Sequence, residues 1–557
     1  MISLILDKDF RFEQDIRELL MAFYPGEDFI YEENEASLLC VYGKDDEIRI
    51  EAAGPARRAV CSEGLEPTGD RAPDKSELKR AFYSMLSRIT GKELPWGTLT
   101  GIRPVKLYEK EFQSLKAELE ARHRAEQELC AENEAVSAAL SEENRRGALN
   151  KKGREHSPYS PETQTKIEEK LDEAARERMR RDYFISEEKL SLLSETALRE
   201  RTALSGKDIK QGFSLYVNIP FCPSTCLYCS FTSNPIERFS GRIGEYLEAM
   251  RRELRLIEAS RKAKAGEELY SPISGKELQT IYIGGGTPTA LSASDLERLI
   301  AMIEEETELS SLYEFTVEAG RPDSIDRDKL RVLKGHGIDR ISINPQTMND
   351  KTLRLIGRRH TAEDVERAYG LAREEGFDNI NMDVIMGLPG EELKDVEHTL
   401  SRIAELKPES LTVHALAVKR AARLNTEGLA YAGLARAGTE EASRMIELGA
   451  DCAKSLGMKP YYLYRQKNMA GNQENVGYCI PGRENLYNIL MMEEKHGVVG
   501  IGAGASTKLI VPNPDPELYG GNPDRVERHE NMKNVSIYLE RIDEVMEKKR
   551  RFLEEIC

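Results

Sequence analysis

Residues 213–231 read FSLYVNIPFCPSTCLYCSF, and residues 280–290 read TIYIGGGTPTA. In both stretches a β-branched and aromatic run, typical of a strand, ends in a turn that carries cysteines or glycines. Further runs of this kind alternate with helical stretches: YEFTVEAG, DRISINPQ, NINMDVIMGLP and SLTVHALAVK. This alternation predicts an α/β fold with a parallel sheet, which right-handed connections curl into a partial or full (β/α) barrel.

The turn after the first run carries Cys222, Cys226 and Cys229, with the spacing C-x3-C-x2-C. In a (β/α) barrel the chemistry lies at the C-terminal ends of the strands, which is where this turn falls. Three thiolates on one loop can each bind one iron of a cubane cluster, which leaves the fourth iron without a protein ligand. An open coordination position is typical of a reactive metal site. A zinc site and three unrelated thiols are the alternatives.

A glycine-rich turn, Gly284-Gly285-Gly286-Thr287-Pro288, follows the second run. Glycines let the backbone approach a ligand closely and offer their N–H groups to it. A tight strand–helix turn is the alternative interpretation. At the end of the second strand of a barrel that starts with the cysteine loop, the turn predicts a ligand contact.

The rest of the chain differs from the barrel segment in its composition and in its pattern of apolar residues. Residues 1–105 predict a small N-terminal α+β domain, and residues 106–205, rich in Glu, Lys, Arg and Ala, predict a charged helical linker or insertion. We expect residues 206–510 to form the barrel with a substrate-binding extension. Residues 511–557 predict a C-terminal helical segment.

The overall composition limits the classes of protein to which this chain can belong. A hydrophobic content of 40% and a charged content of 32% over 557 residues suit a soluble protein of more than one domain. The net charge of −17 argues against a nucleic-acid partner held through its phosphates. No run is apolar and long enough to predict a membrane span or a secretory signal, so we expect a cytoplasmic protein. In a reducing cytoplasm, clustered cysteines favour metal ligation over disulfides.

Together the motifs resemble a known family. Residues from about 213 to 510 resemble the radical S-adenosylmethionine (SAM) family of oxygen-independent coproporphyrinogen III oxidases, through the cysteine loop, GGGTPT, TVEAG, ISINPQTMN and NMDVIMGLPG. Three further stretches resemble its HemZ branch, called coproporphyrinogen dehydrogenase: WGTLTGIRPVKL, HALAVKRAARLN and YYLYRQKNMAGNQENVGY. The resemblance implies a 4Fe-4S cluster whose open iron binds SAM. An electron from the cluster would then release a 5′-deoxyadenosyl radical.

The resemblance also implies roles for particular residues. Cys222, Cys226 and Cys229 match the cluster ligands, on which catalysis depends. Positions that bind SAM in the family match Tyr216, Tyr228, Gly285, Gly286, Thr287, Glu318, Gln346, Arg358, Asp383 and Ala415. Among these, Glu318 matches an acid that holds the cluster-bound SAM, and the last four match positions that line a second SAM site. Whether two SAM molecules bind at once stays open.

Two positions depart from the family pattern. Phe231 stands where the oxidases often carry a fourth cysteine, and Asn218 stands where they carry a histidine. The related haem chaperones share a Phe at the first of these positions. They usually carry a His-Asn pair followed by Tyr-Trp near the end of the barrel, whereas residues 484–488 here read ENLYN. This difference weakens the chaperone alternative.

The resemblance implies a tetrapyrrole substrate with propionate groups, for which basic side chains and aromatic walls are suited. Candidates lie at Lys419, Arg420 and Arg423, and at Arg465 and Lys467 after a tyrosine cluster, although an ordinary solvated turn is the alternative. We expect decarboxylation of two propionates of coproporphyrinogen III to vinyl groups, which gives protoporphyrinogen IX. We also expect a monomer that receives electrons from a donor such as flavodoxin or ferredoxin.

Three other functions remain open at this point. They are a haem chaperone of the same family, a radical SAM enzyme that modifies the haem ring, and a purely structural iron–sulfur or zinc protein. The product of the reaction would separate the first two from the oxidase, and metal and sulfide analysis would identify the third.

Overall fold

The computed structural model describes the chain apart from residues 9, 11, 25–26, 35–36, 45–46, 53–57, 65–74, 101–102, 141–160, 230–233, 418–438, 467–472, 515–523 and 557. Its internal contacts divide the chain into two compact units, Met1–Ala197 and Leu198–Cys557. The finer division into four segments stays a prediction. No helix in the described part of the chain is long and apolar enough to cross a membrane.

The unit Met1–Ala197 holds a five-stranded sheet with the order β2-β1-β3-β4-β5. Its strands are β1 (Ile2–Leu6), β2 (Phe29–Ile30), β3 (Leu39–Lys44), β4 (Glu47–Ala52) and β5 (Arg58–Gly64). Its helices are α1 (Glu13–Phe23), α2 (Lys75–Thr90), α3 (Pro104–Leu140), α4 (Pro161–Tyr183) and most of α5 (Glu187–Leu204). Leu19 of α1 and Phe82 of α2 are buried in one core with Ile2 and Val41 of the sheet. An α+β arrangement therefore surrounds this core.

The unit Leu198–Cys557 is built on an 11-stranded sheet with the order β14-β15-β13-β12-β11-β10-β9-β6-β16-β17-β18. Six neighbouring strands run parallel, each paired with the next in the chain. They are β6 (Gly212–Ile219), β9 (Glu277–Gly285), β10 (Glu314–Glu318), β11 (Arg340–Ser342), β12 (Ile380–Met386) and β13 (Ser410–Ala415). The predicted strand–helix repeat is thus present, and its C-terminal strand ends share one edge.

Additional strands extend both sides of the parallel core. β16 (Gly497–Ile501) pairs in parallel with β6, and β17 (Ser506–Pro512) and β18 (Asp524–Glu530) follow it antiparallel. At the other side β15 (Asn475–Cys479) and β14 (Lys459–Tyr464) add an antiparallel pair. The short strands β7 (Phe221–Cys222) and β8 (Asn234–Pro235) pair with each other.

The sequence predicts a helical segment over residues 511–557, but in the structure the strand β18 lies within this range. The sequence of β18, DRVERHE, is mostly charged and no residue in it is fully buried. An edge strand of this kind lacks the apolar alternation that identifies strands in a sequence.

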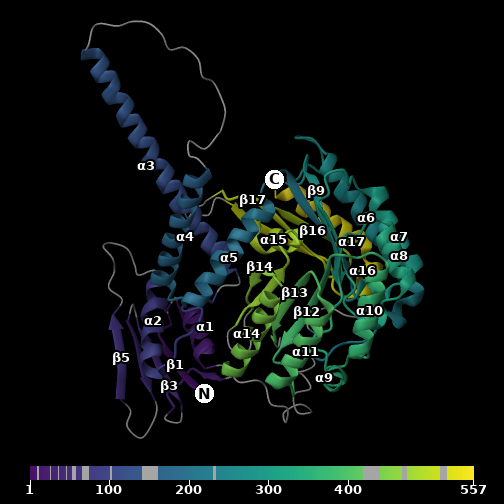
Figure 1. The fold of residues 1–557 in the computed structure, drawn as a ribbon, viewed down its shortest axis with the longest axis horizontal. Coiled ribbons are helices and arrows are strands. Elements are labelled where there is room, and N and C mark those ends of the chain that lie inside the picture. The colour runs from purple at the N-terminus through teal and green to yellow at the C-terminus, as the bar shows by residue number, and fades with distance from the viewer. Residues whose placement is uncertain are drawn as a thin grey trace. The chain divides into compact units, whose positions relative to one another are not determined.

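Helices cover the outer face of the parallel strands (Figure 1). The helices of this unit are α6 (Ile243–Lys262), α7 (Ala293–Glu306), α8 (Arg327–Gly335), α9 (Asp350–Leu355), α10 (Ala362–Glu374), α11 (Leu393–Leu406), α14 (Thr439–Ser455), α15 (Leu486–Glu493), α16 (Val535–Glu540) and α17 (Ile542–Glu555). α15 is not one of the outer helices, because its Tyr487 stacks on Tyr282 of β9 on the inner face. In α7 the buried positions 296, 299, 300 and 303 form one apolar stripe at helical spacing. Ser292 caps this helix by accepting a hydrogen bond from the Asp295 N–H.

Side chains alternate between the two faces of each parallel strand, with a period of two residues. In β9 and its neighbour β6 one face carries apolar residues such as Ile281 and Ile283, which pack under the helices. The other face carries Thr280 and Tyr282 and continues with polar residues on the next strands. The interior of the partial barrel is therefore polar.

A buried ion pair ties the last helix to the barrel unit. The Lys549 ammonium on α17 donates to the Glu253 carboxylate on α6, and both side chains are almost fully buried. The same carboxylate accepts hydrogen bonds from Tyr538, Asn531 and the Gly502 N–H. Every one of these groups is buried. Removal of one partner would therefore leave an uncompensated charge in the interior and lower the stability of the fold.

We predict that Lys549→Met destabilises the protein by about 3–5 kcal/mol, because it leaves a buried carboxylate without its cation. Chemical denaturation would measure the loss. The matched control is Lys548→Met on the same helix, whose pair with Glu544 is exposed to solvent and should contribute little. Equal stabilities of the two variants would contradict the prediction.

Candidate functional site

The cysteine loop follows β6 and includes β7, so it lies at the C-terminal edge of the parallel strands. Cys222 and Cys226 are buried, and Cys229 is half-buried. The Leu227 N–H donates to the Ile356 carbonyl at 2.9 Å, and the Ser224 hydroxyl donates to the Gly357 carbonyl at 3.2 Å. The loop is therefore held by the segment that follows α9.

The glycine-rich turn lies directly against the cysteine loop. The Gly286 and Thr287 N–H groups donate to the carbonyls of Ile219 and Phe221 at 2.8 and 2.7 Å. A Cβ on Gly286 would lie 2.6 Å from the Phe221 carbonyl oxygen and 2.9 Å from the Cys222 Sγ. Only glycine fits there, so the glycine-rich turn and the cysteine loop pack directly against each other.

The three thiols lie close enough together to affect one another's charge. Burial, opposed by a hydrogen bond from Thr287 at 3.5 Å and helped by the nearby Cys229 and Cys226, raises the pKa of Cys222 to about 11. Neighbouring thiolates that repel one another need positive charge beside them. A cubane could supply it, because each sulfur would bind a different iron.

Glu318 ends β10 and faces the barrel interior. Its carboxylate accepts a hydrogen bond from the Tyr282 hydroxyl at 2.5 Å. Burial raises the pKa of Glu318 to about 7; the hydrogen bond from Tyr282 opposes this rise, and the like charge of Asp383 adds to it. Tyr282 itself stacks on Tyr487, with 4.6 Å between ring centroids, and both stack on Tyr216. Three tyrosine rings thus line the interior beside this acid.

Asp383 lies on β12, two strands from Glu318, and its pKa is lowered where that of Glu318 is raised. Burial alone would raise the pKa of Asp383, but hydrogen bonds and charge from His414 hold it below the usual value. The His414 Nε2 lies 3.7 Å from the carboxylate, and Asn381 donates to it at 2.7 Å. The interior therefore contains one protonatable acid and one ionised acid.

Two amide side chains after β11 present oxygens that accept no hydrogen bond from the residues that the structure describes. The Asn344 Oδ1 and the Gln346 Oε1 are both buried and unsatisfied. Gln346 also has a φ of 68°, in the left-handed region that a non-glycine residue rarely adopts. Buried acceptors and backbone strain in one loop are typical of a ligand site.

Arg358 connects strand ends to the cysteine loop. Its guanidinium donates to the Asn344 carbonyl at 2.6 Å, to the Gly320 carbonyl at 3.3 Å and to the Tyr228 hydroxyl at 3.3 Å. Although burial disfavours its charge, Tyr228 and Cys226 raise the pKa of Arg358. The structure thus brings Arg358 and Tyr228 together with the cysteines.

The remaining expected residues fall in two groups. Ala415 ends β13, where its N–H donates to the Asn475 side chain at 3.0 Å. Arg465 follows β14 and is buried, which lowers its pKa to about 10. The other predicted substrate ligands and Phe231 lie outside the described residues: Lys419, Arg420, Arg423 and Lys467. Their roles stay predictions, as do those of the SAM positions.

Sequence reasoning missed several residues of this interior. Tyr282 sits in a strand whose apolar neighbours hide it, and Tyr487 comes from a helix far along the chain. Arg321 directly follows the quoted TVEAG stretch, and its guanidinium lies 3.6 Å from the Cys226 Sγ. The signal in the sequence was an arginine placed directly after the end of a predicted strand.

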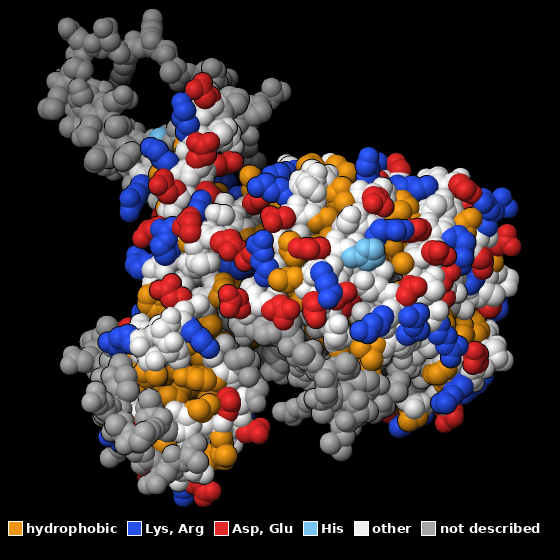
Figure 2. Space-filling view, turned by 60° about the horizontal axis from the view of Figure 1, so that its bottom comes forward, with side chains coloured by type: hydrophobic (Ala, Val, Ile, Leu, Met, Phe, Trp, Pro, Cys, Tyr) orange, Lys and Arg blue, Asp and Glu red, His pale blue; other side chains and the backbone are white. Residues whose placement is uncertain are grey.

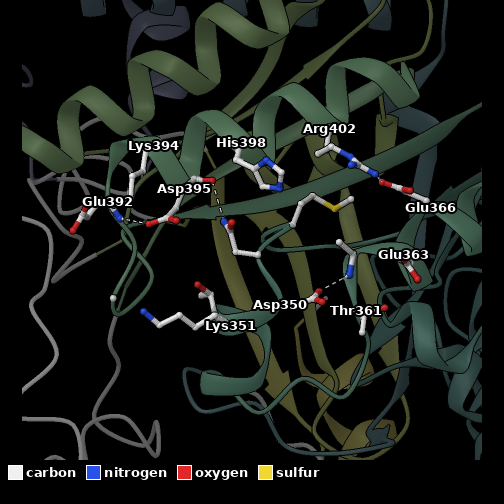
Figure 3. Close-up of a pocket in the computed structure, with 15 residues that line it drawn as sticks. Asp350, Lys351, Thr361, Glu363, Glu366, Glu392, Lys394, Asp395, His398 and Arg402 are labelled. Atoms are coloured by element: carbon white, nitrogen blue, oxygen red, sulfur yellow. Dashed lines mark hydrogen bonds and ion pairs between the residues drawn. The ribbon is translucent and has the colours of Figure 1, made fainter.

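A separate cavity of about 690 Å³ lies near the first turns of α9, α10 and α11 (Figure 3). Acidic and basic side chains line it, among them Lys351, Glu363, Lys394, His398 and Arg402. Arg402 is paired with Glu366, and Asp395 caps α11. None of the expected site residues lines this cavity, so it is distinct from the barrel interior.

We predict that Gly286→Ala sharply reduces the iron and sulfide that the protein retains, because the new Cβ would displace the cysteine loop. Anaerobic reconstitution followed by iron and sulfide analysis would measure this. Gly370→Ala on α10 is the control, since a Cβ there meets nothing within 4 Å. Full cluster content in Gly286→Ala would show that the two loops are not tightly packed.

Glu318 should make the cofactor-free protein less stable in alkali. Because its folded pKa of about 7 exceeds the ordinary 4.5, its contribution is complete below about pH 4.5 and is lost as the pH rises through 7. Between pH 5 and 8 the variant Glu318→Gln should therefore lose about 1–3 kcal/mol less stability than the unmodified protein. Denaturation curves at several pH values test this, and parallel curves for both proteins would contradict it.

Comparison with known proteins identifies the family. Residues 216–403 match the Radical SAM superfamily. The chain is 37% identical over 484 residues to a Bacillus subtilis (strain 168) protein described as oxygen-independent coproporphyrinogen-III oxidase-like protein HemZ, covering 86% of this chain and 81% of that protein. It is also 41% identical over 207 residues to the heme chaperone HemW of the same organism, covering 37% of this chain and 51% of that protein.

The coproporphyrinogen III oxidase HemN from Escherichia coli is similar in structure, with a TM-score of 0.46 and 21% identity over 63% of this chain and 73% of that one. The family predicted from the sequence is confirmed by the HemZ-like relative, which is matched over most of its length. The chain belongs to the radical SAM superfamily, in the group of oxygen-independent coproporphyrinogen-III oxidase-like proteins.

Proposed function

We propose that the protein decarboxylates two propionates of coproporphyrinogen III to vinyl groups, without oxygen. The observation that carries the proposal is the 37% identity to the HemZ-like relative, which extends over 86% of the chain and so includes regions outside the radical SAM match. The polar barrel interior beside the cysteine loop supports it, because a charged substrate would need such an interior.

Radical SAM proteins use a 4Fe-4S cluster and SAM, and this family therefore uses both. When bound, they supply the radical that removes a hydrogen atom from the substrate. The three cysteines would hold the cluster. The Gly285–Thr287 turn and Glu318 lie beside them and would hold SAM, whose ammonium and hydroxyl groups suit a carboxylate and backbone acceptors.

The chain itself would bind and orient the tetrapyrrole. Reaction needs one propionate β-carbon to be held within about 3–4 Å of the attacking carbon, and then the other propionate in turn. The Tyr464 hydroxyl on β14 lies 3.3 Å from the His414 Nδ1 near the end of β13. We place the macrocycle against this tyrosine, with Arg465 and the basic residues at 419 and 420 available for propionates.

The balance of the reaction determines what else is needed. Each propionate loses one hydrogen atom to the radical, one electron to a one-electron acceptor, and carbon dioxide, which leaves a carbon–carbon double bond. The cluster must receive an electron beforehand, from a donor such as flavodoxin or ferredoxin. On the face that Figure 2 shows, acidic and basic side chains are interspersed. A small charged donor would therefore have to recognise a local arrangement of charges.

A haem chaperone is the second candidate, because the HemW relatives match the barrel at up to 41% identity. Residues 484–488, where the chaperones usually have histidine and tryptophan, are used here for packing. The Asn485 side chain caps α15 and donates to Glu314 at 3.0 Å, while Tyr487 stacks on Tyr282. Stoichiometric haem binding without decarboxylation would favour the chaperone.

We predict that anaerobically reconstituted protein, given SAM, a reductant and coproporphyrinogen III, forms the divinyl product with loss of two carbon dioxide molecules. Cys226→Ala should abolish turnover, because it removes a cluster ligand. Cys452→Ala on α14 is the control, since this thiol donates to the Leu400 carbonyl and lies outside the cysteine loop. Mass spectrometry would identify the product. Deoxyadenosine without decarboxylation would refute the substrate and leave the radical chemistry standing.

A further inference from the structure

Arg321 is a buried cation that touches the cysteine loop. It follows β10, and its side chain is 3% exposed. One guanidinium nitrogen, Nη1, lies 3.6 Å from the Cys226 Sγ and donates to the Ser224 carbonyl at 3.2 Å. The other, Nη2, donates to the Ser224 hydroxyl at 3.0 Å. A single side chain therefore contacts the loop at three atoms.

Asp323 fixes the direction in which the guanidinium points. It accepts two parallel hydrogen bonds from Arg321, through Nε and Nη2, each at 3.0 Å. On its other side the Asp323 carboxylate lies 3.7 Å from the Nδ1 of the buried His360. Such a two-point bond between a carboxylate and a guanidinium leaves little rotational freedom, so Nη1 remains directed at the sulfur.

Asp323 compensates the buried charge of Arg321, but a neutral thiol is only a weak acceptor for the remaining Nη1 hydrogen. A thiolate bound to iron carries negative charge and accepts a charge-assisted hydrogen bond. The contact with Cys226 therefore matches the cluster-bound form of the loop. Arg358 also contacts Cys226. Its guanidinium, however, donates mainly to backbone carbonyls and to the Tyr228 hydroxyl.

We propose that Arg321 is a positioning residue that raises the reduction potential of the cluster by donating a hydrogen bond to the Cys226 thiolate. Reduction adds one negative charge to the cluster. A fixed guanidinium beside one sulfur stabilises the reduced form more than the oxidised form, and hydrogen bonds to cluster sulfurs are a recognised control of potential. The role concerns electron uptake, so it holds whichever substrate the enzyme acts on.

The test uses the full chain, anaerobically reconstituted with iron and sulfide and without SAM or substrate. Arg321→Gln should shift the midpoint potential, followed by electron paramagnetic resonance in a redox titration, to a more negative value. Arg321→Lys keeps the charge but loses the planar contact and should show a smaller shift. Arg327→Gln is the control, because this arginine is partly exposed and pairs with Glu374 and Glu375. A fully loaded Arg321→Gln protein with an unchanged potential would overturn the proposal.

A second measurement detects the contact between the arginine and the cluster directly. In the reduced protein labelled with ¹⁵N-arginine, pulsed electron paramagnetic resonance should detect a guanidinium nitrogen coupled to the cluster. The coupling should weaken in Arg321→Lys and persist in Arg327→Lys. If Arg321→Gln fails to retain a cluster, this comparison decides. No arginine coupling in the unmodified protein, or the same coupling in Arg321→Lys, would refute the role.

Discussion

The site depends on the contact between Gly286 and the cysteine loop. No side chain fits between this glycine, the Phe221 backbone and the Cys222 sulfur. Because the glycine-rich turn also donates two backbone hydrogen bonds to carbonyls at the start of the cysteine loop, the two behave as one structural element. A cofactor that binds the cysteines must therefore lie beside the glycine-rich turn. Close backbone packing, rather than any side chain, brings these two motifs together.

The parallel sheet supplies the second requirement, an interior where polar groups can be buried. Its strands place apolar residues under the helices and polar residues on the opposite face. On that inner face Glu318 has a raised pKa and Asp383 a lowered one, although both are buried. Burial raises the pKa of Glu318 more than the hydrogen bond from Tyr282 lowers it, whereas the hydrogen bond and charge of His414 outweigh burial at Asp383. One interior can thus present a neutral donor and a charged acceptor at the same pH.

Positive charge near the cysteines is local. The chain carries a net charge of −17, yet Arg321 and Arg358 both lie at the buried face of the cysteine loop. Both are held by groups from strand ends, so their positions follow from the barrel and not from the loop alone. A cluster that accepts electrons benefits from fixed cations that cannot rotate away. The global charge of a chain therefore says little about the field at such a site.

The sequence by itself determined the motifs and the order of the elements. The spacing of the cysteines, the three glycines and the repeat of strand and helix are local patterns, and they were sufficient to predict the family and the parallel sheet. The edge strand β18 escaped prediction, because its charged residues carry no apolar alternation. Only the tertiary structure decided which distant side chains meet the motifs. Tyr487 reaches Tyr282, and Arg321 reaches Cys226, because pairing of parallel strands and packing of α15 bring together residues far apart in the chain.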